Sequence, residues 1–68
     1  MNEETFNLEI RRFLKQFGVT AQRELEKAVA AAIAERRLQG GETLAARAVL
    51  HVDGLGDVVT VTGTLALA

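Results

Sequence analysis

The last third of the chain carries an alternating pattern that predicts a β-hairpin. Apolar residues stand at even positions in residues 44–53 and at odd positions in residues 58–67, with the sequence VDGLGD around the turn. Alternation of this kind places the apolar side chains of a strand on one face. A lone hairpin is at best marginally stable in water, so something has to cover that face. This requirement constrains the fold of the whole chain.

The parity of the two apolar sets also restricts the strand register. The sets share a face only if opposed residue numbers have an odd sum, unless a bulge intervenes. A two-residue turn at Gly54-Leu55 and a four-residue loop over residues 54–57 both satisfy this condition, and a bulge at Gly56 would relax it. In either register Gly63 lies opposite a small alanine.

The first half of the chain has the spacing of amphipathic helices. One helix is predicted over residues 3–17, with Asn2 as its N-cap and Gly18 in the left-handed position that ends it. A second is predicted over residues 21–39, capped by Thr20 and stopped by the glycines at positions 40 and 41. The inward faces consist of Phe6, Ile10, Phe13, Leu14 and Phe17 in the first helix and of Ala21, Leu25, Ala28, Val29, Ala32 and Ile33 in the second.

These elements predict an α+β fold of the order ααββ, forming a single small domain over residues 1–68. The two N-terminal helices are expected to pack on one face of the C-terminal antiparallel hairpin, because each element has one apolar face to bury.

Nothing covalent reinforces a domain this small. A chain of 68 residues has no cysteine and a single histidine, which excludes disulfides and thiolate zinc sites. Domains of this size bury only about 60% of their unfolded surface and often rely on oligomerisation. We therefore expect a homodimer, in which two hairpins join edge to edge into a four-stranded sheet. The second strand has no charge and supplies the candidate contact residues Val59, Thr60, Val61, Thr62, Thr64 and Leu65.

Composition argues against several classes of function. The net charge of −1 gives no positive field for nucleic acid or anionic membranes. No apolar run approaches membrane-spanning length, and acidic residues precede the first cation, so we expect a cytoplasmic protein. With neither serine nor cysteine, the common nucleophile triads cannot form. We expect no enzyme, no cofactor and no metal.

A nucleic-acid-associated regulator is the main alternative. The segment FLKQFGVTAQRELEKAV places a glycine between two predicted helices, as in a helix-turn-helix. The positions six and nine residues after Gly18, apolar in that motif, are Glu24 and Lys27. The match is therefore divergent, and DNA binding is not the leading hypothesis.

Two further groups of residues could have a function, and each also has a purely structural explanation. Arg11, Arg12 and Lys15, with Leu8 among them, form an outer helix face that could contact an acidic partner or simply match the helix dipole. His51, Asp53 and Asp57 surround the hairpin turn and carry ligand-type atoms, although Asp-Gly is ordinary turn chemistry. Small-ligand or metal binding at this turn is the least favoured hypothesis.

The chain also resembles a family of short bacterial proteins of unknown function. The resemblance rests on the opening MNEETFNLEIRRFLK, the segment GVTAQ and the late VDGLG turn, and it covers nearly all of the chain. It implies no activity, cofactor or site residue. The leading hypothesis is a non-enzymatic protein-protein interaction module that associates through the hairpin edge or the outer helix face.

Overall fold

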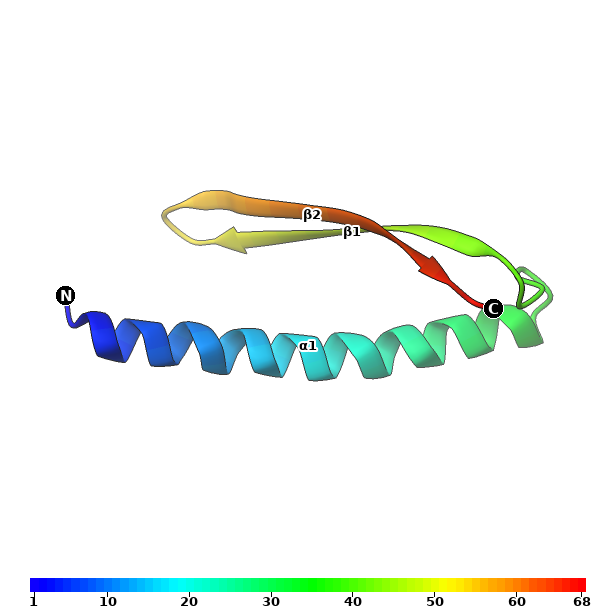
Figure 1. Cartoon of the computed structure of the whole chain (residues 1–68), viewed down its shortest axis with the longest axis horizontal. Coiled ribbons are helices and arrows are strands. Elements are labelled where there is room, and N and C mark those ends of the chain that lie inside the picture. The colour runs from blue at the N-terminus through cyan, green and yellow to red at the C-terminus, as the bar shows by residue number, and fades with distance from the viewer. The chain divides into compact units, whose positions relative to one another are not determined.

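The computed structural model describes all 68 residues. One helix, α1 (Glu3–Ala34), is followed by two strands, β1 (Thr43–Val52) and β2 (Gly56–Ala66) (Figure 1). The chain divides into two compact units, Met1–Arg37 and Leu38–Ala68, and each is described by itself. The predicted α+β class and C-terminal hairpin are confirmed, with one helix in place of two.

The start of α1 is the predicted one. Oδ1 of Asn2 accepts a hydrogen bond from the backbone N–H of Thr5 at 3.0 Å, as an N-cap side chain does. Glu3 and Glu4 occupy the first turn, where the helix dipole favours negative charge. This end of α1 is therefore fixed by local sequence alone.

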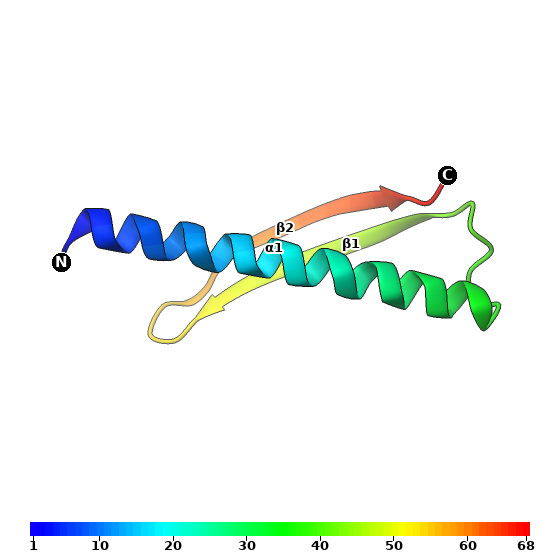
Figure 2. The same ribbon diagram turned by 90° about the horizontal axis from the view of Figure 1, so that it is seen from below.

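The prediction of two helices over residues 3–17 and 21–39 is wrong, because α1 continues through Gly18 and Thr20 (Figure 1 and Figure 2). Gly18 lacks the positive φ that a helix end would require there. A glycine in a helix costs only about 1 kcal/mol relative to alanine, and the alanine-rich stretch over residues 28–34 favours helix strongly. Without a turn at this point, the helix-turn-helix alternative loses its structural basis.

Gly18→Ala should therefore raise the free energy of unfolding by about 1 kcal/mol, the difference in helix propensity between the two residues. A Cβ built at Gly18 meets no atom within 4 Å, so the methyl group adds no clash. Urea denaturation of the two proteins at equal concentration measures the difference. A helix that ended at Gly18 would give the opposite sign, a loss of similar size.

The other end of α1 forms a Schellman motif around an arginine. The N–H of Arg36 donates to the carbonyl of Ile33 at 3.0 Å, and the N–H of Arg37 donates to the carbonyl of Ala32 at 2.8 Å. Arg36 has a φ of 63°, in the left-handed region that usually takes glycine. The helix thus ends at Ala34 rather than at residue 39, and the predicted glycine stop lies in the loop beyond.

The register of the hairpin agrees with the parity expected from the sequence. β1 and β2 form a two-stranded antiparallel sheet in which Leu44 is opposite Leu65 and Leu50 is opposite Val59. The apolar sets of the two strands therefore share one face. The prediction that Gly63 faces a small alanine is confirmed, because its partner is Ala46.

The turn differs from both predicted loops. The register shifts between Leu50 and His51, so that Val58 has no partner and forms a bulge, and Val52 pairs with Gly56 around a three-residue loop. The N–H of Leu55 donates to the carbonyl of Val52 at 2.9 Å, closing a β-turn. Gly54 within this turn has a φ of 86°, which a side chain would disfavour.

Little of the apolar surface is enclosed. Ala32, 5% exposed, is the only buried residue. The rings of Phe6, Phe13 and Phe17 are 51%, 54% and 53% exposed. The covering of the hairpin face by helical residues stays a prediction. α1 has no stretch apolar enough to span a bilayer.

Candidate interaction surfaces

The backbone of the hairpin leaves both of its edges open. The N–H of Leu67 donates to the carbonyl of Glu42 at 2.9 Å, which identifies these two opposed residues as a hydrogen-bonded pair. Such pairs alternate along an antiparallel ladder with pairs whose N–H and C=O groups point outward. Counting along the register, the outward groups of β2 belong to Thr60, Thr62, Thr64 and Ala66. No third strand satisfies them.

The β2 edge is the less protected of the two. Residues 58–68 carry no charged side chain, whereas Arg47 stands in the middle of β1. Charged residues on an edge strand oppose the addition of another strand. The predicted contact residues of β2 thus belong to an uncharged edge, and Val61 is 61% exposed on its apolar face.

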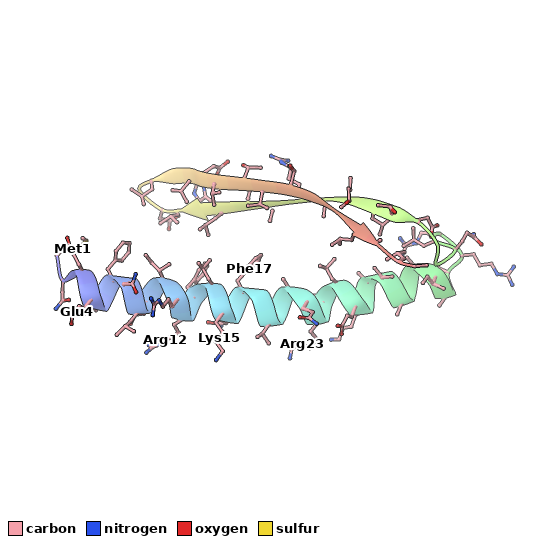
Figure 3. All side chains as sticks on the ribbon, in the orientation of Figure 1. Met1, Glu4, Arg12, Lys15, Phe17 and Arg23 are labelled. Carbon is pink, nitrogen blue, oxygen red and sulfur yellow. The ribbon has the colours of Figure 1, made fainter.

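The outer face of α1 holds the other predicted contact residues. Figure 3 shows Arg12, Lys15 and Arg23 on the opposite side of α1 from Phe17. Arg12 pairs with Glu9 at 3.5 Å, and both side chains are exposed, so the pair contributes little. Arg11 and Leu8 are exposed on the same helix. The structure places these residues on one element, and Arg12 is the one cation among them that forms an ion pair.

The bulge brings His51 and Asp57 together. They are opposed across the hairpin, and Nδ1 of His51 lies 2.8 Å from Oδ1 of Asp57. Nε2 of the same ring lies 3.8 Å from Oδ1 of Asp53. The three side chains are exposed and no group of three or more His, Cys, Asp or Glu side chains could hold a metal ion. The hydrogen bond ties the strand ends together beside the turn.

A carboxylate that the sequence reading missed organises the loop before β1. Oε2 and Oε1 of Glu42 accept hydrogen bonds from the backbone N–H groups of Gln39 and Gly40, each at 2.8 Å. These bonds favour the charged form, first from Gln39 and then from Gly40, and lower the pKa of the Glu42 carboxyl. A glutamate two residues after a glycine is the only sequence signal for such a cap, and it is a weak one.

The Glu42 carboxyl should titrate below the ordinary glutamate value of about 4.3. A pKa lowered in the folded state stabilises the fold above the unfolded pKa, and this contribution disappears as pH falls through the folded pKa. Carboxyl carbon shifts recorded by NMR across the acid range report the midpoint directly. Glu42→Gln keeps one acceptor oxygen and should remove this part of the pH dependence. A midpoint at or above the ordinary value would contradict the cap.

Together these observations define a small α+β protein with an open, uncharged strand edge and an exposed helix face. The model of a family of unknown function, DUF6494, matches residues 1–68, so the chain belongs to that family. The resemblance to a short family of unknown function is thereby confirmed. No curated protein and no solved structure matches the chain.

Proposed function

We infer that this chain is a non-enzymatic self-association module whose partner is a second copy of itself, joined along the outer edge of β2. The observation that carries this proposal is the open, uncharged edge on which Thr60, Thr62 and Thr64 direct their backbone groups outward. Unpaired edges of this kind are templates for strand addition. The cytoplasmic location expected from the sequence stays part of the proposal.

A symmetric edge-to-edge pairing suits the β2 edge. If Thr62 lies on a two-fold axis, Thr60 of one copy is opposite Thr64 of the other, and the three outward threonines find outward partners. On the apolar face, Val59 of one copy is then opposite Leu65 of the other. The two hairpins would form a four-stranded sheet with one continuous apolar face.

The exposure of the titratable residues supports a role other than catalysis. His51 is the only histidine, and its side chain and those of its two aspartate neighbours lie on the surface of the hairpin. General acid–base groups are usually tuned by burial and charged neighbours within a cleft. The hydrogen bond between His51 and Asp57 has a structural explanation, because it joins the two strands beside the turn.

Sedimentation equilibrium over a wide range of protein concentration tests self-association. A dimer should also show a thermal midpoint that rises with protein concentration, because dilution favours the dissociated chains. A chain that remains monomeric up to the millimolar range, with a midpoint independent of concentration, would overturn the proposal.

A further inference from the structure

The continuous helix α1 carries an apolar stripe that repeats every eleven residues. Its ten positions are separated by 4, 3, 1, 3, 4, 3, 1, 3 and 4 residues. This stripe, called the α1 stripe below, consists of Phe6, Ile10, Phe13, Leu14, Phe17, Ala21, Glu24, Leu25, Ala28 and Ala32. An eleven-residue repeat has about 3.67 residues per turn, close to a straight α-helix, so the stripe stays on one side along the whole of α1.

The order of spacings in the α1 stripe reads the same in both directions, with its centre at position 19. A second copy of α1 laid antiparallel and centred there would place a stripe position opposite every stripe position. We propose that α1 pairs antiparallel with α1 of a second copy through this stripe. This interface rests on the proposed self-association and names a second contact for it.

Side-chain size favours the antiparallel orientation. The first half of the stripe is bulky and the second half is small, so Ile10 is opposite Ala28, Phe13 is opposite Leu25 and Phe17 is opposite Ala21 of the other copy. Ala32, which is 5% exposed, is already enclosed within its own chain, so the contact between copies is formed by the positions from Ile10 to Ala28. Facing large and small residues keeps the distance between helix axes uniform. A parallel pair would instead crowd the rings of both copies at one end and leave a gap between alanines at the other.

Charge at the helix ends favours the same orientation. Glu3 and Glu4 lie in the first turn of α1, and Arg36 and Arg37 follow its last turn. In an antiparallel pair centred on position 19, the acidic turn of one copy approaches the segment of residues 35–37 of the other at both ends. Glu35 there is neutralised by its ion pair with Arg37, which leaves Arg36 as the unpaired cation near the acidic turn. A parallel pair would bring like charges together at each end.

The exposed area fits an interface between two copies. The three phenylalanine rings of the stripe are about half exposed. A fully enclosed aromatic side chain buries about 150–250 Å², so on the order of 300 Å² of ring surface per chain is left to enclose. A standard interface takes about 800 Å² from each partner, and Ile10, Leu14 and Leu25 add to the rings.

Glu24 is the one polar residue in the α1 stripe. Its carboxylate lies 3.6 Å from Nζ of Lys27, and its side chain is 60% exposed. In the antiparallel pair it is opposite Leu14 of the other copy. Glu24→Leu should therefore tighten self-association by roughly tenfold or more. Glu26→Leu, on the other side of α1, removes the same charge and should leave the affinity unchanged.

Cysteine cross-linking determines the orientation directly, because the natural chain has no cysteine. Ile10→Cys and Ala28→Cys are prepared separately, checked for folding by circular dichroism, and oxidised alone and as a mixture. The mixture should give a disulfide-linked dimer, and each variant alone should not. A mixture of Ile10→Cys with Ala21→Cys, which is out of register, is the matched control.

The possible results separate the two proposals. Cross-linking of Ile10→Cys with itself would show a parallel pair and overturn the antiparallel one. A dimer by sedimentation that forms no cross-link between positions 10 and 28, and that Glu24→Leu does not tighten, would refute the α1 interface while the self-association module stands. A chain that stays monomeric under all conditions would refute both.

Discussion

Phe13→Ala should lower the free energy of unfolding by about 3–5 kcal/mol, the usual cost of removing a phenylalanine from an enclosed apolar cluster. Leu8→Ala should change it by no more than about 0.5 kcal/mol, as at ordinary surface positions. The two side chains are similarly exposed in the single chain, at 54% and 59%. Only Phe13 belongs to the α1 stripe, so the difference between the two changes in unfolding free energy reports whether the stripe is buried. Denaturant unfolding at equal protein concentration measures both.

The concentration dependence of this loss identifies what encloses the ring. A loss at Phe13 that shrinks on dilution means that the ring is enclosed between copies, because dilution removes that contact from the parent protein as well. A loss that is constant with concentration assigns the enclosure to the same chain. Equal, small effects at Phe13 and Leu8 would show that the stripe remains in water, and would contradict the expected burial.

Apolar periodicity predicted the element types because it reports which face of each element must leave water. The alternation in residues 44–53 and 58–67 gave both strands. Its parity limited the register to pairs with an odd sum, and the observed pairing of Leu50 with Val59 is one of the two registers left open. The open β2 edge also followed from sequence, since the absence of charge over residues 58–68 needs no coordinates. These features depend only on local pattern.

The C-terminal end of α1 shows where local signals fail. Gly18 has the residue type of a helix end but lies inside α1, and Arg36 has the left-handed φ that usually belongs to glycine. A single glycine is a weak stop signal, because its cost of about 1 kcal/mol is smaller than the gain from a continuous apolar face. The spacing of the stripe, which carries on from Phe17 to Ala21 without a break, was the better indicator.

The polar contacts were the least predictable part of the candidate surfaces. His51 and Asp57 meet because a bulge at Val58 shifts the register by one residue, and nothing in the sequence fixes that shift. The two hydrogen bonds to Glu42 likewise depend on the path of the loop before β1. Such contacts follow from backbone geometry that alternation alone does not specify.

Thr62→Pro should weaken the dimer by about 3 kcal/mol or more, roughly a hundredfold in Kd. Thr62 is opposite Arg47 in a pair whose N–H groups point outward, so the substitution removes no hydrogen bond between β1 and β2. On the proposed two-fold axis, however, the change occurs twice at one point. Two N–H donors are lost there, two carbonyl acceptors are left without partners, and two rings separate the strands. Sedimentation equilibrium measures the change in Kd.

Ala45→Pro is the matched control, because the N–H of Ala45 points outward from β1, the opposite edge of the same hairpin. This substitution places a proline ring in another pair whose N–H groups point outward, and it should leave the dimer intact. If Ala45→Pro weakens association and Thr62→Pro does not, the edge of β1 is the interface despite Arg47. If neither variant changes Kd, strand pairing does not hold the copies together, and the α1 stripe has to supply the whole of the association.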